Sequence, residues 1–570
     1  MKELNEVLKG WEAVIGLEIH TELTTLDTKM FCGCKLSHDD EPNANVCPVC
    51  LGLPGALPVP NKHAIESIVK AGLATNCEIQ RRSMFYRKHY FYPDMAKNFQ
   101  TTQGPVAFCM HGHLDLEVTG AGAKERPACA FGEAEAESLA SASANAVGLS
   151  TAMSAQLREG GVASGAAEGG ALAGMSSYDT ANLATAERHE DGSYTVPIRI
   201  LRIHMEEDAA KMVHVGGEEG RITAAAESLI DYNRCGTPLI ELVTEPDLRT
   251  PEEARLFMEK LRRIFLTIGI SDCSMEKGSM RCDGNVSLRR RGESRLGTKT
   301  ELKNLNSFKS LHDGLAYEIC RQAEVLEQGG IIYQETRHWE PSRKRTVVMR
   351  TKETADDYRL FPDPDLAPFD LSEEFIDHCR EELPELPDAK RARFEVDFGI
   401  KRADAEQLAG DPELAEFFEG AATALAGKEK RKAAQTVANL LVNELPAYLK
   451  ASGSTLAGSK LDAAYVAALA ELLAADAISS NQGHEVFVAM AESGEDPNKI
   501  VDERGMRQVS DTGALQPIVD QVLAACADQA QQYRDGNQKV IGYLVGQCMK
   551  ASRGTGNPKL FNELLRKALS

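Results

Sequence analysis

The sequence predicts an α+β protein in which a strand-rich body precedes an all-helical middle domain and a small helical tail domain. Residues 11–118 and 194–370 contain short β-branched runs separated by turn residues. From about residue 372 the chain is instead rich in Ala and Leu at helical spacing, and a polar stretch at residues 478–497 divides this helical half. We therefore expect domains at residues 1–371, 372–480 and 481–570.

Composition indicates a soluble protein of several domains, with 570 residues of which 43% are hydrophobic and 26% charged. No run approaches the roughly 20 apolar residues of a membrane span, and the first residues, MKELNEVLKGWEAVIG, lack the apolar core of a signal peptide. We expect a cytoplasmic protein without membrane contact. The net charge of −21 argues against indiscriminate nucleic-acid binding, because phosphate contacts require Lys and Arg.

The first expected strand has one charged face. In VIGLEIHTEL, residues 14–23, alternation places Glu18, His20 and Glu22 together and puts three apolar side chains on the opposite face. Two carboxylates and an imidazole at this spacing can hold a divalent cation. A polar strand face without a ligand is the alternative.

Four of the fourteen cysteines lie close together in FCGCKLSHDDEPNANVCPVC, residues 31–50. A CxC pair and a CxxC pair can converge into the tetrahedral four-sulfur site that structural zinc prefers. Such a closed site leaves no position for substrate, so it would brace a loop. The alternative is a group of buried free thiols. The predicted zinc ligands are Cys32, Cys34, Cys47 and Cys50.

A low-complexity segment at about residues 121–190 interrupts the body. It is rich in Ala, Gly and Ser and poor in bulky apolar residues, as in GGVASGAAEGGALAGMSS. This composition is typical of a flexible insertion.

A second charged strand follows in RIHMEEDAAK, residues 202–211, where His204, Glu206 and Asp208 share a face if the strand extends that far, with Glu207 on the other face. A helix begins shortly afterwards. Thr250 is the expected N-cap, and Glu253 is expected to close a capping box. Four residues with helical spacing are expected on its buried face, namely Phe257, Leu261, Ile264 and Ile268.

A third polar face is expected in MRCDGNVSLR, residues 280–289, from Asp283, Asn285 and Ser287. Three oxygen-rich faces in one body favour a site for magnesium and phosphate, because Mg²⁺ takes hard oxygen ligands and leaves positions for phosphate. The chain contains neither GxxxxGK[ST] nor GxSxG, and GESRLGTKT at residues 292–300 misses the first by one position. If ATP binds, it binds outside a P-loop.

Long motifs follow one another along the chain: WEAVIGLEIHTEL, the CxC and CxxC run ending in CLGLPGALPVPN, RKHYFYPDMAKNFQTTQ, RIHMEEDAAK, DYNRCGTPLIELVTEPDLRTPEEA, MRCDGNVSLR, GTKTELKNLNSF, MRTKETADDYRLFPDPDL and GYLVGQCMKASRGTGNPKL. Together they resemble the GatB family, the B subunits of the aspartyl/glutamyl-tRNA(Asn/Gln) amidotransferases. The resemblance covers nearly the whole chain outside residues 121–190.

The resemblance implies a kinase-like cradle and an ATP-dependent aminoacyl-tRNA amidotransferase. In that family, phosphoryl transfer from ATP turns the side-chain carboxylate of Glu-tRNA(Gln) or Asp-tRNA(Asn) into an acyl phosphate that ammonia can attack. Mg²⁺ and basic residues must neutralise the phosphate charge. The resemblance further implies a heterotrimer in which the amidase, or A, subunit supplies ammonia through a channel and the small C subunit braces the pair.

The resemblance also implies site residues. The magnesium ligands would be Glu18, His20, Glu206 and Glu207, and the catalytic residues Glu18, His20, Glu207 and Lys211. Nucleotide or the aminoacyl end would be held by Asp283, Lys299, Glu301, Lys303 and Asn304.

The C-terminal segment is locally basic, which is consistent with tRNA binding by an acidic protein. Lys550 and Arg553 are expected near the end of one helix, three residues apart on its outer face, and the resemblance implies that this tail meets tRNA. The alternative is that these cations only interact favourably with the negative end of the helix dipole.

Two other functions remain open at this point. One is a zinc-containing tRNA-binding protein without catalysis, and the other is a relative of the archaeal-type E subunit, which acts on Glu-tRNA(Gln) alone. The residues do not decide whether Glu-tRNA(Gln), Asp-tRNA(Asn) or both are used.

Overall fold

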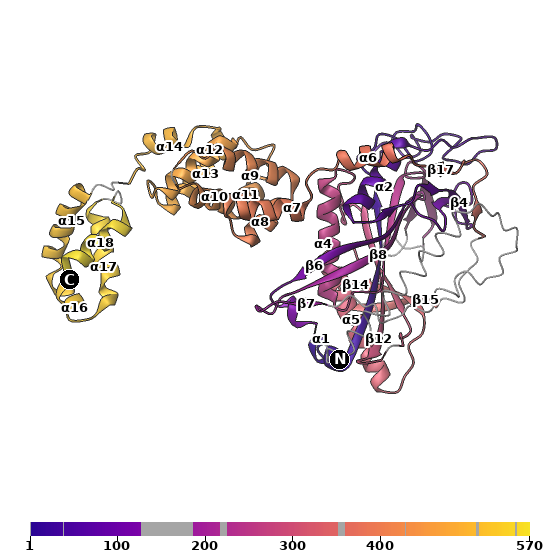
Figure 1. Ribbon diagram of the computed structural model, residues 1–570, viewed down its shortest axis with the longest axis horizontal. Helices are drawn as coiled ribbons and strands as arrows, with labels where there is room; N and C mark the ends of the chain where they lie inside the picture. The colour runs from indigo at the N-terminus through magenta and orange to yellow at the C-terminus, as the bar shows by residue number, and fades with distance from the viewer. Residues whose placement is uncertain are drawn as a thin grey trace. The chain divides into compact units, whose positions relative to one another are not determined.

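The structure is a computed structural model that describes residues 2–37, 39–126, 186–216, 225–293, 295–351, 359–427, 429–508, 512–552 and 556–569. The chain forms two compact units, Met1–Pro384 and Glu385–Ser570. The first is rich in strands and the second is helical, as the sequence predicts (Figure 1). Most of the expected flexible insertion, residues 127–185, lies outside the described residues. At its flanks, η1 (Gly122–Lys124) and β7 (Glu187–Arg188) are described.

The first unit is built around one large sheet. Its strand order is β15-β14-β13-β12-β1-β11-β8-β5-β4-β16, and β6, β7 and β2 complete thirteen strands. The strands are β1 (Trp11–Glu22), β2 (Glu78–Ile79), β4 (Phe85–His89), β5 (Phe99–Gln103), β6 (Cys109–Val118), β8 (Tyr194–Glu207), β11 (Pro238–Thr244), β12 (Met280–Arg290), β13 (Thr300–Lys303), β14 (Glu335–Glu340), β15 (Arg345–Thr351) and β16 (Phe361–Pro362), with β7 as given above. Two small sheets join β9 (Lys211–Val215) to β10 (Glu227–Asp231) and β3 (Arg82–Ser83) to β17 (Phe369–Asp370).

Helices cover one face of the large sheet. The helices of this unit are α1 (Leu4–Gly10), α2 (Lys62–Ala74), α4 (Pro251–Thr267), α5 (Phe308–Glu327) and α6 (Glu373–Glu381). In Figure 1, α4 and α5 lie against the long strands, and they pack on each other. Leu17 and Ile19 of β1 are buried, and a Cβ built on Gly284 of β12 would lie 3.2 Å from Leu315 of α5. The apolar positions of β1 therefore face the helices, which leaves its polar positions for the other face.

Helix α4 begins at the predicted N-cap, but only one of the two hydrogen bonds of the predicted capping box is formed. Thr250 is the N-cap and accepts a hydrogen bond from the Glu253 amide at 3.1 Å. The Glu253 carboxylate does not return to the Thr250 amide; it accepts from the amide of Arg249 at 2.6 Å and the hydroxyl of Tyr194 at 2.8 Å. The buried carboxylate therefore ties α4 to β8. Three of the expected core residues are buried, and Ile268 is the half-buried C-cap.

The second unit contains helices from residue 387 onward, drawn in orange and yellow in Figure 1. They are α7 (Pro387–Arg393), η5 (Phe394–Phe398), α8 (Arg402–Ala409), α9 (Pro412–Ala424), α10 (Lys430–Asn439), η6 (Leu440–Glu444), α11 (Leu445–Ser452), α12 (Ala463–Ala474), α13 (Ser480–Ser493), α14 (Pro497–Glu503), α15 (Thr512–Ala525), α16 (Ala527–Arg534), η7 (Gln538–Val540), α17 (Ile541–Ala551) and α18 (Pro558–Leu569).

Two hydrophobic cores divide this unit. The first contains buried residues from Phe394 to Val501, and the second contains buried residues from Leu515 to Leu569. Helix α13, which begins at the boundary expected near residue 480, contributes Phe487 and Met490 to the first core. The domain boundaries expected at 371/372 and 480/481 remain predictions, beside a division of the structure at Pro384 and a change of core after Val501.

Candidate functional site

A cluster of carboxylates and imidazoles lies on the polar face of the central strands. The register places His20 of β1 opposite Glu241 of β11, and Glu241 opposite His204 of β8. Glu18 lies two residues before His20 on the same face, and Glu206 lies two residues after His204. Three neighbouring antiparallel strands thus bring together five polar side chains that are distant in sequence. We call Glu18, His20, His204, Glu206 and Glu241 the strand cluster.

His20 is the centre of this cluster. Its Nε2 lies 3.2 Å from Oε2 of Glu241, 3.6 Å from Oε1 of Glu206 and 3.8 Å from Oε1 of Glu18. Nε2 of His204 lies 3.6 Å from the same Glu241 oxygen. Glu18, His20 and Glu241 can bring one ligand atom each within 4.8 Å of one another, and His204, Glu206 and Glu241 can do the same. The two sets share Glu241.

Burial and proximity change the acidities of the strand cluster. Burial opposes protonation of His20, but its hydrogen bond to Glu241 and two further carboxylates raise its pKa to about 9. Burial lowers the pKa of His204 to about 4 and raises that of Glu206 to about 7. Burial also raises the pKa of Glu18, with the Glu241 carboxylate adding to the effect.

The donor set fits a bound divalent cation. Three carboxylates surround His20, which binds a metal ion only in its neutral form, so a bound cation would replace the imidazolium proton in balancing their charge. Nδ1 of buried His204 has no hydrogen-bond partner among the described residues. Carboxylate oxygens suit Mg²⁺, and the imidazoles add nitrogen donors.

Predicted nucleotide residues extend this polar face. Asp283 of β12 lies opposite Glu18 of β1 in the register. Lys303 of β13 donates to Asp283 at 2.5 Å and lies 3.2 Å from the Glu301 carboxylate. Burial opposes the charge of Lys303, but Asp283 raises its pKa to about 12. Glu18, Asp283, Lys303 and Glu301 therefore form one continuous charged surface beside His20.

Asn304 lies next to this surface with a φ of 67°. Its amide nitrogen donates to the Trp339 carbonyl at 3.2 Å and lies 3.2 Å from Nε2 of His338, and its amide oxygen accepts from Asn306 at 2.8 Å. The side chain is therefore engaged in holding β14 against the end of β13.

Three predicted residues are not brought into the strand cluster. Glu207 follows Glu206 on β8 and lies on the opposite face, where it pairs with Lys97 and accepts from the Thr101 amide at 2.8 Å. Lys211 is exposed at the start of β9, in the separate two-stranded sheet. Lys299 is exposed in the loop before β13.

A second charged group lies where β8 ends. Asp208 follows the last residue of β8 and accepts from Arg281 at 2.8 Å, and it also pairs with Arg234. Arg234 and Arg281 both contact the buried Glu22 carboxylate, at 2.9 and 3.2 Å. Burial raises the pKa of Asp208 to about 6 even though Arg234 opposes the shift. β8 ends at Glu207, so the strand does not extend to Asp208, but Asp208 still contacts Arg281, which lies opposite His20 in the register.

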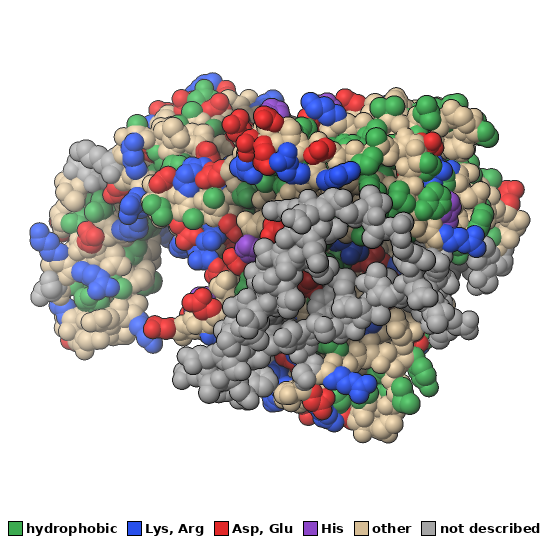
Figure 2. Space-filling view, turned by 45° about the vertical axis from the view of Figure 1, so that its right-hand side comes forward, with side chains coloured by type: hydrophobic (Ala, Val, Ile, Leu, Met, Phe, Trp, Pro, Cys, Tyr) green, Lys and Arg blue, Asp and Glu red, His purple; other side chains and the backbone are tan. Residues whose placement is uncertain are grey.

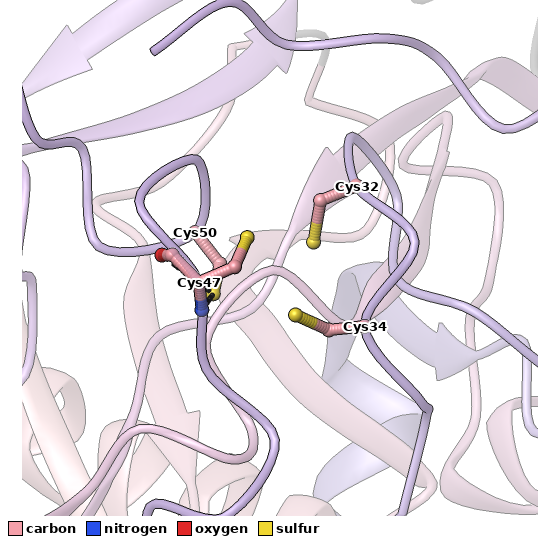
Figure 3. A group of neighbouring side chains, drawn as sticks. All are labelled: Cys32, Cys34, Cys47 and Cys50. Atoms are coloured by element: carbon pink, nitrogen blue, oxygen red, sulfur yellow. Dashed lines mark hydrogen bonds between the residues drawn. The ribbon is translucent and has the colours of Figure 1, made fainter.

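The four cysteines of the loop after β1 converge. Figure 3 shows Cys32 and Cys34 on one side and Cys47 and Cys50 on the other, with their side chains pointing toward a shared centre. Their sulfurs all lie within 4.8 Å of one another, and ligands on a tetrahedral zinc with Zn–S of about 2.3 Å lie about 3.8 Å apart. The set therefore fits one zinc ion. We call these residues the cysteine cluster.

Neighbouring thiols have unequal acidities in this cluster. A hydrogen bond with the Cys32 thiol lowers the pKa of Cys50 to about 5 and raises that of Cys32. Burial raises the pKa of Cys34 to about 11. The backbone amide of Cys47 donates to Cys50 Sγ at 3.1 Å, which also favours the thiolate at Cys50.

The predicted tRNA residues are only partly described. Lys550 is exposed in the last turn of α17, and Arg553 lies outside the described residues. Leu544 and Cys548 of α17 are buried as expected, and α18 begins at Pro558. On the face shown in Figure 2, basic and acidic side chains are interspersed over the described surface.

The ligands predicted from the sequence do not include Glu241. This residue is the one acid of the otherwise apolar strand PLIELVT, and that isolation is the signal that points to it. The sequence pattern places His204 on the correct face but does not mark it as a ligand. None of the described helices combines the length and apolar character that crossing a bilayer requires.

Comparison with known proteins identifies two matching domain families, the GatB/GatE catalytic domain at residues 13–377 and the GatB domain at residues 416–569. The chain is 42% identical over 563 residues to the B subunit of an aspartyl/glutamyl-tRNA(Asn/Gln) amidotransferase from Carboxydothermus hydrogenoformans, covering 99% of this chain and 100% of the relative. It is 40% identical to the protein of that name from Persephonella marina, covering 98% and 99%, and 39% identical to that from Brevibacillus brevis, covering 99% and 100%. The resemblance seen in the sequence motifs is confirmed, and this chain belongs to the GatB family.

Proposed function

We propose that this chain is the B subunit of a tRNA-dependent amidotransferase that converts Glu-tRNA(Gln), Asp-tRNA(Asn) or both into the amidated forms. The single observation that supports this best is the match to amidotransferase B subunits over 98–99% of the chain, in both domain families. The proposal includes a cytoplasmic complex with the A and C subunits.

The strand cluster is the proposed centre of a kinase-like cradle. Bound ATP would supply the phosphoryl group that activates the side-chain carboxylate, and Mg²⁺ would neutralise phosphate charge. The metal would be held by Glu18, His20 and Glu241 or by His204, Glu206 and Glu241, the two sets that share Glu241. In this proposal Glu207, whose carboxylate lies on the other face of β8, anchors Lys97 and the Thr101 amide instead of binding that metal.

The basic part of the site has a separate role in the proposal. Lys303 lies between Asp283 and Glu301, and this arrangement fixes its ammonium beside Glu18. A positive charge held there can orient an anionic phosphate without being free to move away. Lys299 and Lys211 are exposed, so they are proposed to contact nucleotide or the aminoacyl end only from the rim.

Reconstitution tests this function. The chain is assembled with the A and C subunits, and ATP consumption and amide formation are measured with Glu-tRNA(Gln), with Asp-tRNA(Asn) and with uncharged tRNA. We expect both activities to require a misacylated tRNA. Binding of tRNA without ATP consumption would instead support a non-catalytic zinc-containing protein, and activity with Glu-tRNA(Gln) alone would match the specificity of the archaeal-type E subunit.

The tail is proposed to contact tRNA through Lys550. The test uses Lys550→Ala in the full chain and complex, with the exposed Lys450 of α11 replaced by Ala as the matched control. Losing one phosphate contact should reduce the slope of log affinity against log salt by about 0.7–0.9. An unchanged slope would assign Lys550 to the helix end alone.

A further inference from the structure

Lys29 is a fully buried lysine in the loop between β1 and the cysteine cluster. Its exposed fraction is 0%, and its ammonium makes three contacts. Nζ donates to the Asn45 carbonyl at 2.8 Å, to the Tyr232 carbonyl at 3.2 Å and to Cys50 Sγ at 3.8 Å. An ammonium has three hydrogens, so these contacts use all of them.

The partners of Lys29 are unusual for a buried charge. Within the described parts of the chain, no carboxylate forms an ion pair with its ammonium, and the nearby Glu207 is paired with Lys97. Burying an isolated ammonium is costly unless an opposite charge lies close to it. The contact that can carry such a charge is Cys50 Sγ, because a metal-bound cysteine is a thiolate.

The cysteine cluster can supply the negative charge that Lys29 requires. Zinc with four thiolates carries a net charge of about −2. Cys50 is the buried member of the cluster, whereas the other three cysteines are partly exposed, so water can offset less of the charge on its sulfur. A hydrogen bond from an ammonium to a metal-bound thiolate is the kind of outer contact that orients a ligand and stabilises its charge.

We propose that Lys29 is a positioning residue of the zinc centre, which compensates the charge on Cys50 and joins the centre to the segment before β11. The inference rests on the proposed zinc site. The second part follows from the Tyr232 contact, which is reinforced by the Cys235 thiol donating to the Cys50 carbonyl at 3.2 Å and by the Asn45 amide donating to Asn233 at 2.8 Å.

The contacts between the cysteine loop and the segment before β11 also connect the zinc centre to the charged group at the end of β8. The same segment carries Arg234, which contacts Glu22 and Asp208. Metal-dependent ordering of the loop would therefore extend to Arg234 through Tyr232 and Asn233, without any contact between zinc and substrate.

The test compares Lys29→Met with wild type in the full chain. Methionine is similar in length but has no charge and no N–H donor. Zinc affinity is measured by competition with a chromogenic chelator, and Co²⁺ is substituted for zinc to record the sulfur-to-metal charge-transfer bands. Lys35→Met is the control, because Lys35 lies in the same loop but is exposed and pairs with Asp40.

We expect Lys29→Met to bind zinc about 10- to 100-fold more weakly than wild type. The Co²⁺ charge-transfer bands should shift, and amide hydrogens at residues 231–236 should exchange faster in the zinc-loaded variant. Lys35→Met should match wild type in all three. If Lys29→Met does not fold, Lys29→Gln, a neutral donor, is measured in the same way and should show the same losses.

Two outcomes overturn the inference in distinguishable ways. A wild-type chain that binds no zinc removes the proposed zinc site together with the role of Lys29. A wild-type chain that binds zinc, with affinity and Co²⁺ bands unchanged in the folded Lys29 variant, removes the role of Lys29 alone.

Discussion

The cysteine cluster and the strand cluster are both candidate metal sites in one unit, but they are assembled in different ways. The cysteine cluster comes from a single loop between residues 32 and 50, as two close pairs. The strand cluster comes from three strands between residues 18 and 241, with at most two ligands from any one strand. A local motif therefore reveals the first site in the sequence, whereas sheet register creates the second.

The two clusters also differ in how their charge is balanced. At the cysteine cluster, the buried Lys29 ammonium and a backbone amide contact one sulfur. At the strand cluster, His20 is surrounded by three carboxylates, and burial raises the pKa of Glu206 to about 7. The first is suited to a permanent structural ion, and the second to an ion that arrives with its own anionic ligand.

The largest expected effect is the loss of zinc when two residues of the cysteine cluster are replaced. Wild type should contain about one zinc per chain, and the Cys47→Ser/Cys50→Ser double variant should contain none, because serine does not replace thiolate in a four-sulfur site. Metal analysis of the purified protein measures this, with Cys526→Ser in the second unit as control. Zinc retained by the double variant would contradict the assignment.

A large effect on activity is expected at the strand cluster. Glu241→Gln keeps the shape of the side chain but removes the carboxylate shared by both ligand sets. Amidation by the reconstituted complex should fall about 100-fold or more, since a metal ion contributes several kcal/mol to such a step. Glu187→Gln on the exposed β7 is the control. Near-normal turnover of Glu241→Gln with unchanged tRNA binding would move the site elsewhere.

An intermediate effect, on Mg²⁺ affinity, should distinguish the adjacent residues Glu206 and Glu207. Glu206→Gln should weaken Mg²⁺ binding, measured calorimetrically with a non-hydrolysable ATP analogue, by about tenfold or more. Glu207→Gln should change that affinity little, because its carboxylate lies on the other face with Lys97. Equal losses in both variants would show that the metal is not held by the strand cluster alone.

The smallest effect concerns a histidine outside both clusters. Nε2 of His312 lies 3.4 Å from Glu125 and Nδ1 lies 3.1 Å from Asp313, and the hydrogen bond to Glu125 raises its pKa. A raised pKa in the folded state stabilises the protein below the unfolded value of about 6.5, and this stabilisation is lost as the pH rises through the folded value.

His312→Gln should therefore lower the thermal midpoint of the first unit at pH 6 and have little effect well above the folded pKa. The loss in the free energy of unfolding at pH 6 should be at most about 1 kcal/mol, because the pair is partly exposed. Exposed His113→Gln is the control. A pH-independent loss would assign His312 to packing and would remove its pairing with Glu125 and Asp313 as a source of pH dependence.

Several features follow from the sequence alone because they depend on local interactions. The strand-rich body, the helical C-terminal half, the N-cap of α4 and the alternation that separates Glu18 and His20 from Leu17 and Ile19 all depend on neighbours within a few residues. The close spacing of the four cysteines likewise identifies their cluster.

Tertiary structure decided which of the predicted polar residues meet. Alternation fixes the face of each side chain, but only the register of β1, β11 and β8 places Glu241 between His20 and His204. Asp208 pairs with Arg234 and Lys29 reaches Tyr232 only when the segment before β11 folds against the end of β8 and the loop after β1. Register and loop packing depend on contacts between segments far apart in the chain, which one-dimensional periodicity does not encode.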